Sequence, residues 1–246
     1  MSRPPRLILP NHPNHIVNRG NNRRRLFSYR EDYRTFIRLL ANAYRKENCE
    51  LNAACLLDNH THALNTPPSV TAASACAKRY AQRYAQIRNL KREGSGKLFE
   101  QRFYSKPVTS VIQLAYTTMY IEANPLRAGL VTDALDYPWS TYALHAGEPE
   151  RSAFPSWMWT PSRWYLGLGR SADERAATYR QLFEVYVRGG LRPDHADELE
   201  KLDLLDRPYT LRLRRPDESR AAESAASRWP FARKRRAMTG GCEGGE

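Results

Sequence analysis

The chain has 246 residues, 41% of them hydrophobic and 26% charged, which is enough for one large or two small globular domains with a buried core. Its formal net charge is +13. The whole excess lies in the first 110 residues, which carry 20 Lys and Arg against 7 Asp and Glu. This one-sided basic excess, in which arginine outnumbers lysine, favours a polyanionic partner.

Several classes of protein are excluded by what the sequence lacks. No stretch approaches 18 consecutive apolar residues, and the first residues lack the apolar run of a secretory signal. The four cysteines have neither CxxC nor zinc-knuckle spacing. We therefore expect a cytoplasmic protein with reduced thiols and no membrane partner, associated with the nucleoid when it is bound to DNA. Common nucleotide-binding and hydrolase motifs are also absent.

Apolar periodicity and turn residues divide the first 131 residues into short strands and amphipathic helices. In chain order we predict a strand at 16–19, a helix at 31–46, strands at 51–57 and 60–65, a helix at 69–89, a strand or extended loop at 98–108, a helix at 110–123 and a short segment at 126–131. This order predicts an α+β fold with a ferredoxin-like (RRM-like) antiparallel sheet and helices packed on one face.

The character of the chain changes after Gly147. We expect a main domain over residues 1–147, a helical C-terminal extension over 148–210 with one helix at 172–187, and a basic, poorly ordered tail over 211–246. Trp157, Trp159 and Trp164 are expected to pack together in the extension. His145 belongs to no pattern and is expected at the surface.

A pair of histidines is the sharpest chemical feature. His60 and His62 stand two apart on a predicted strand, so their imidazoles face the same side and can reach one divalent metal ion. The competing interpretation is that two histidines fall two apart on a polar strand by chance.

Tyr120 and Asn124 form a second candidate group. They stand four apart near the end of a predicted helix and so share one of its faces. A phenol beside a cation-bound phosphodiester can attack phosphorus, and an asparagine oxygen can ligate the same cation. The competing interpretation is that Tyr116 and Tyr120 pack the helix onto the sheet.

Five sequence blocks in this order resemble the single-tyrosine HUH transposases, and most closely the REP-associated tyrosine transposase group of IS200-like proteins. They are HIVNRGNNRRRLF with EDYRTFIRLL, NAACLL followed by DNHTHAL, LFEQRFYSKPV, YIEANPLRAGLV and DYPWSTYALH. The resemblance covers roughly residues 12–145, and it implies that the main domain is an HUH transposase-like catalytic domain.

The resemblance implies an enzyme that nicks and rejoins single-stranded DNA at hairpin-forming repeats through a 5′-phosphotyrosine. By it, Tyr120 is the nucleophile, and His60, His62 and Asn124 hold Mg²⁺ or Mn²⁺. Such transposases include monomers and homodimers. The sequence departs from the family at Asp58, where proline is usual, and at Ala63 and Asn65, where larger apolar residues are common.

Basic and polar residues near these motifs are candidate DNA contacts. They are Arg19, Asn21, Arg23, Arg24 and Arg25 in the first loop, with Arg102 and Lys106 further along the chain. Two other functions stay open. One is a DNA-hairpin-binding regulator with the same fold and impaired cleavage, to which Asp58 points. The other is an RNA-binding or ribosome-associated protein, which would explain the charge but not the two histidines and the tyrosine.

Overall fold

The structure, a computed structural model, describes residues 7–92 and 95–189. The predicted tail at 211–246 and part of the predicted extension lie outside these ranges. The strands are β1 (Asn14–Arg19), β2 (Glu50–Leu56), β3 (His60–Thr66) and β4 (Tyr104–Pro107). The helices are α1 (Arg30–Lys46), α2 (Val70–Lys91), α3 (Val111–Glu122), α4 (Asn124–Arg127), α5 (Tyr142–His145), α6 (Arg163–Leu166) and α7 (Ala172–Arg188).

The four strands form one antiparallel sheet in the order β2-β3-β1-β4. With α1 between β1 and β2, and α2 between β3 and β4, this is the ferredoxin-like topology predicted from the order of elements. The predicted boundaries lie within two residues of the observed ones except at 98–108 and 126–131, where α4 covers Asn124–Arg127 and residues 128–131 belong to no helix or strand. Within 98–108 only Tyr104–Pro107 pairs with β1, so β4 is a short edge strand ending at a proline.

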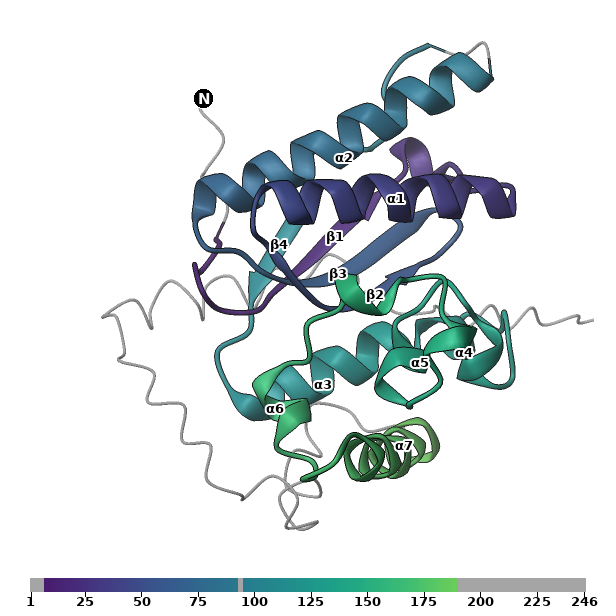
Figure 1. Cartoon of the computed structure of the whole chain (residues 1–246). Coiled ribbons are helices and arrows are strands. Elements are labelled where there is room, and N and C mark those ends of the chain that lie inside the picture. The colour runs from purple at the N-terminus through teal and green to yellow at the C-terminus, as the bar shows by residue number, and fades with distance from the viewer. Residues whose placement is uncertain (1–6, 93–94, 190–246) are drawn as a thin grey trace, which may run out of the picture. The chain divides into compact units, whose positions relative to one another are not determined.

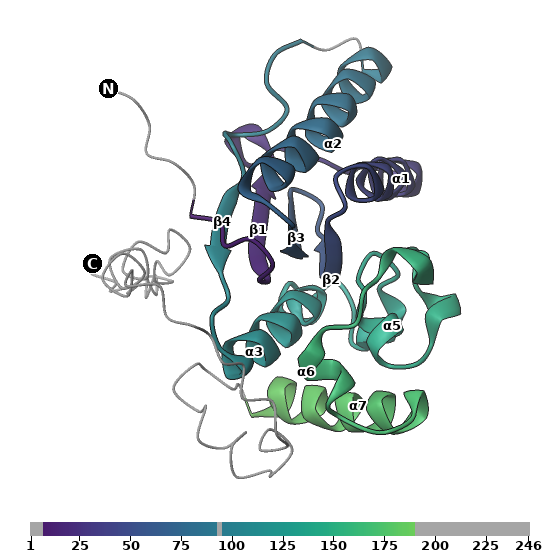
Figure 2. The same cartoon turned by 60° about the vertical axis from the view of Figure 1, so that its left-hand side comes forward.

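Helices cover both faces of the sheet (Figures 1 and 2). α1 and α2 lie together on one face, as expected, whereas α3 lies on the other. Side chains alternate between the two faces along β1, so this strand contacts the helices on both sides of the sheet. Asn18 donates a buried hydrogen bond to the hydroxyl of Tyr80 on α2, at 2.8 Å. His15 points to the opposite side, where its ring lies 6.0 Å from that of Tyr120 on α3.

Serine caps begin α2 and α3, where the sequence places a serine before the helix. Ser69 accepts a hydrogen bond from the backbone of Ala72 at the start of α2, and Ser110 does the same for Gln113 at the start of α3. α3 ends before the Asn124–Pro125 step, and α4 begins there with its proline in the first turn. Tyr120 and Asn124 therefore lie on either side of a helix junction.

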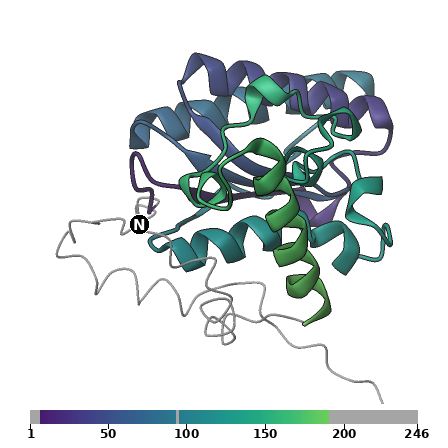
Figure 3. The same ribbon diagram turned by 60° about the horizontal axis from the view of Figure 1, so that its bottom comes forward.

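The segment after α4 folds back beside α3. α6 contacts both α3 and α7, and α7 runs past α3 on the face away from α1 and α2 (green in Figure 3). Of the three tryptophans expected to pack together, Trp164 is buried and Trp159 is half-buried, and both lie among the rings of Tyr165 and Tyr179. Trp157 is 58% exposed. Within 7–92 and 95–189, no helix has the length and apolar character needed to span a membrane.

Candidate active site

The two histidines and Tyr120 meet on the α3 face of the sheet. His60 and His62 project from β3 with ring centroids 4.9 Å apart. Tyr120 arrives from the last turn of α3, and its ring centroid lies 5.7 Å from that of His62. Segments far apart in the sequence are thus assembled into one cluster, as the resemblance implies.

Both candidate ligands are held as neutral imidazoles. Burial, followed by the positive charge of Arg19, lowers the pKa of His60 to about 4. Burial, followed by the neighbouring His15 and His60, lowers the pKa of His62 well below its usual value. A metal ion binds the unprotonated ring nitrogen, so these shifts keep both side chains ready to bind a cation at neutral pH.

Hydrogen bonding selects the nitrogen that each ring offers. His60 donates from Nδ1 to the side-chain oxygen of Asn59 at 2.6 Å, which leaves its Nε2 with the lone pair. His62 Nδ1 lies 2.9 Å from His15 Nε2. His62 Nε2 is buried and has no hydrogen-bond partner among the described residues. A buried, unpartnered nitrogen beside a second histidine fits a divalent cation.

Asn124 is oriented by the end of α3. Its amide nitrogen donates to the backbone oxygens of Tyr120, at 2.8 Å, and Ile121, at 3.2 Å. These bonds use the amide nitrogen and not the side-chain oxygen. Over the described ranges, no group of three or more His, Cys, Asp or Glu side chains is placed to share a metal ion. A third protein ligand would have to be of another type, such as this amide oxygen.

His15 is a component of the site that sequence reasoning missed. It is buried on β1, 47 positions from the histidine to which it bonds, and neither spacing nor periodicity marks it. With the proton on His62 Nδ1, His15 Nε2 accepts it and fixes the tautomer whose Nε2 can bind a metal. A group that hydrogen-bonds the other ring nitrogen of a metal-binding histidine usually has this role.

We expect His15→Leu to weaken Mn²⁺ binding by about 10- to 100-fold, because His62 loses the partner that fixes its tautomer and ring orientation. Isothermal titration of the protein with Mn²⁺, in the absence of DNA, measures this directly. His12→Leu is the matched control, because His12 bonds the backbone oxygen of Pro10 away from the site. Equal Mn²⁺ affinity in the two variants would remove His15 from the site.

The charges of two arginines act on the phenol of Tyr120. Burial raises its pKa above the ordinary value, and the charges of Arg127 and Arg19 oppose that rise. The Arg127 guanidinium lies 5.2 Å from the centre of the Tyr120 ring and donates to the hydroxyl of Tyr186 on α7, at 2.5 Å. Arg127 was not predicted, because it lies beyond the junction between α3 and α4 and no spacing along a single helix relates it to Tyr120.

The loop at 20–25, here called the basic loop, lies next to β3, the strand that carries His60 and His62. Gly20 donates its backbone N–H to the oxygen of Asn59, immediately before His60, at 2.8 Å. A Cβ at Gly20 would lie 2.1 Å from the backbone oxygen of Arg24, so only glycine permits this turn. The predicted arginines Arg23, Arg24 and Arg25 extend from it and are exposed, and Asn21 is half-buried.

Of the other candidate DNA contacts, two lie on the face of the sheet that carries the cluster and one is exposed beside β4. Arg19 is paired with His60 across the β1–β3 ladder, and Lys106 is paired with His15 across the β1–β4 ladder, so both belong to the face that carries the cluster. Arg102 is exposed two residues before β4. Asp58 forms an exposed ion pair with Arg25, at 3.3 Å.

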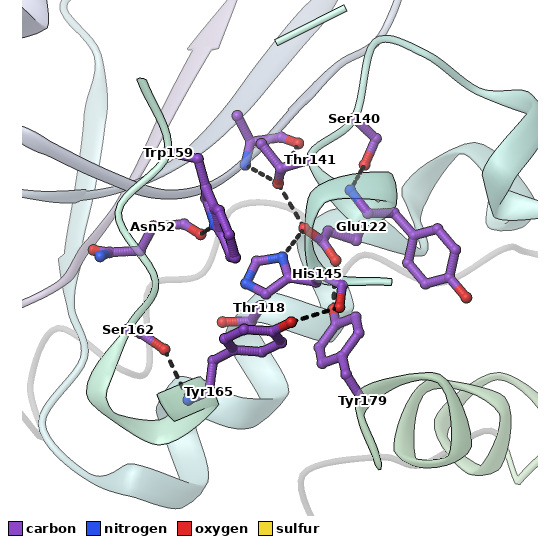
Figure 4. A network of polar contacts seen from close by, with 12 residues as sticks. Asn52, Thr118, Glu122, Ser140, Thr141, His145, Trp159, Ser162, Tyr165 and Tyr179 are labelled. Carbon is purple, nitrogen blue, oxygen red and sulfur yellow. Dashed lines mark hydrogen bonds and ion pairs between the residues drawn. The ribbon is translucent and has the colours of Figure 1, made fainter. Parts of the chain in front are cut away.

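A buried polar network anchors the end of α3 (Figure 4). Glu122, two residues after Tyr120, is fully buried and accepts hydrogen bonds from Thr141, at 2.5 Å, and from Tyr179 on α7. His145 Nδ1 lies 2.8 Å from the same carboxylate. The prediction that His145 is a surface residue was wrong, since it is fully buried. Charged and polar groups in the interior need such partners.

Comparison with known proteins finds a similar family and a similar solved structure. Residues 9–124 match the family described as Transposase IS200 like. No curated protein sequence gives a significant match. The solved structure of a REP-associated tyrosine transposase bound to a REP hairpin is similar, with 18% identity and a TM-score of 0.49 over 66% of this chain and 93% of that chain. The family match spans β1 to Asn124 and includes both histidines and Tyr120. Residues 9–124, a little under half of the chain, are therefore similar to the IS200-like transposase family.

Proposed function

We propose that this protein is a transposase that nicks and rejoins single-stranded DNA at hairpin-forming repeats, with Tyr120 as the nucleophile. The observation that carries the proposal is the approach of the Tyr120 ring to within 5.7 Å of the His62 ring, beside the unpartnered Nε2 of that histidine. A phenol packed only for structure would not need a basic, metal-competent group at that distance. The hairpin substrate follows from the sequence blocks shared with single-tyrosine transposases.

In the proposed reaction the Tyr120 oxygen forms a bond to phosphorus as the bond from phosphorus to the 3′ oxygen breaks. The phenol loses its proton and the departing 3′ oxygen gains one, so the products are a 5′-phosphotyrosine and a free 3′-OH. A second 3′-OH reverses the exchange and returns the proton to Tyr120. The phosphodiester energy is kept in the covalent bond, so no nucleotide cofactor is needed.

The residues around the phenol support this chemistry. Arg127 and Arg19 stabilise negative charge on the Tyr120 oxygen and oppose the effect of burial on its pKa. His60 and His62, together with the Asn124 oxygen, would hold Mg²⁺ or Mn²⁺. When bound, that cation withdraws electron density from the phosphodiester and favours attack. The network around Glu122 holds the α3 end that carries the nucleophile.

The test is covalent trapping on a denaturing gel. The full chain is incubated with labelled single-stranded hairpins from repeats flanking its gene, in Mg²⁺ and in EDTA, with an RNA hairpin of matching sequence as control. We expect a protein–DNA adduct that requires the cation and does not form with RNA. Hairpin DNA binding without an adduct would favour the regulator with impaired cleavage, and preference for the RNA would favour the RNA-binding function.

The basic loop gives an independent prediction. Replacing Arg23 and Arg24 together by alanine should weaken hairpin binding and reduce the slope of log affinity against log salt by about one for each phosphate that is no longer neutralised. Both side chains are exposed, so the fold should be unaffected. Fluorescence anisotropy across a salt series measures the slope. An unchanged slope would show that the loop does not contact the DNA backbone.

A further inference from the structure

A groove separate from the histidine cluster lies between α1 and the segment at 153–157. Its volume is about 330 Å³. The floor is apolar and includes Ile37 and Ala41, and Pro155 and Trp157 lie opposite. None of its lining residues belongs to β1, β3 or α3, which supply the catalytic cluster. The groove is therefore a different surface from the one where the DNA is cut.

Trp157 gives this groove an exposed aromatic ring. It is the only tryptophan more than half exposed in the part of the chain that the structure describes. The Arg45 guanidinium lies 4.4 Å from the centre of the indole. An indole that is more than half exposed presents apolar surface to water, and tryptophan is enriched at binding interfaces.

Arginines line the same groove. Arg34 and Arg38 are one helical turn apart on α1, are both exposed and contribute to its wall, and none of the lining residues in the described ranges is acidic. Arg34 makes a long contact of 3.9 Å with Glu31, and both of these side chains are mostly exposed. Arg45 lies beside the indole that lines the groove, so three arginines lie in or next to the groove. The groove is thus electrostatically matched to a polyanion.

The combination of an exposed indole and guanidinium groups fits unpaired nucleotides. An unpaired base can stack on an indole, while the neighbouring phosphates meet arginines. The bases of a duplex are already stacked on one another, so a duplex cannot use the indole face in this way. An acidic peptide would satisfy the arginines but would leave the flat apolar ring without a matched partner.

We propose that the groove between α1 and Trp157 binds the single-stranded DNA that flanks the hairpin, with one base stacked on Trp157 and phosphates on Arg34 and Arg38. The identity of this DNA as a transposition substrate rests on the proposed function. The groove gives the enzyme a second hold on its substrate, away from the site of cleavage.

The test uses oligothymidine, which needs no knowledge of the target sequence. The full chain is titrated with labelled oligothymidine and, separately, with a blunt duplex of the same length. Trp157→Ala should bind oligothymidine about 10-fold more weakly and the duplex equally well. Arg38→Ala should weaken oligothymidine binding and lower its salt slope by about one. Arg163→Ala is the matched control, because it removes an exposed arginine on α6, away from the groove.

Tryptophan fluorescence supplies a second measurement. Oligothymidine should quench the emission of the wild-type protein, and Trp157→Phe should abolish most of that quenching. Unchanged oligothymidine affinity in Trp157→Ala, or equal weakening of duplex binding, would overturn the proposal. The proposed function fails separately, if the wild type forms no adduct with hairpins, and that result would leave the oligothymidine comparison intact.

Discussion

Tyr120→Phe is expected to abolish the covalent protein–DNA adduct while leaving hairpin affinity within about twofold of wild type. The change removes the oxygen proposed to attack phosphorus and keeps the ring that packs beside His62 and Arg127. Binding depends instead on phosphate contacts elsewhere on the surface. A denaturing gel for the adduct and an anisotropy titration for binding, on the same hairpin, separate the two effects.

Tyr116→Phe is the matched control for that variant. Tyr116 lies one turn earlier on α3 and its ring lies 6.1 Å from that of Tyr186, so it shares the helix and the neighbourhood but not the approach to the histidines. Its adduct yield should equal that of wild type. An adduct that persists in Tyr120→Phe would show that another residue is the nucleophile. Loss of the adduct in both variants would indicate that α3 had moved rather than that a nucleophile was lost.

The second large effect is expected from Glu122→Leu, which should reduce the free energy of unfolding by about 3–5 kcal/mol. Removing the carboxylate leaves Thr141, His145 and Tyr179 buried without their shared acceptor. A loss of this size is a large fraction of the total stability of a typical domain. Urea unfolding followed by circular dichroism measures it, and adduct yield should fall as well because α3 loses its anchor.

Glu184→Leu is the corresponding surface control. It removes a glutamate from α7 whose ion pair with Arg188, at 3.1 Å, is exposed, so the change in unfolding free energy should stay near ~0.5 kcal/mol. A milder variant, Tyr179→Phe, removes a single hydroxyl from the network and should keep the fold. A loss for Glu122→Leu no larger than that for Glu184→Leu would mean that the network contributes little to stability.

The ferredoxin-like unit was predictable because each of its elements has a local signal. A compact apolar run of strand length indicated β2, the segment after it was predicted as a neighbouring strand and is β3, and apolar periodicity indicated α1 and α2. The same local spacing put His60 beside His62. The placement of α3 on the opposite face from α1 and α2 had no such signal, because an amphipathic pattern shows that a helix packs but not against which face.

By itself, then, the sequence determined the order of elements in the unit, the pair of histidines and the candidate tyrosine on a later helix. Only the tertiary structure decided which residues from distant parts of the chain contact the histidines and the tyrosine. His15 reaches His62, Arg127 reaches Tyr120, and His145 turns inward to Glu122. The physical reason is that periodicity records whether a position is buried, whereas the partner of a buried polar group depends on segments that meet only when the chain folds.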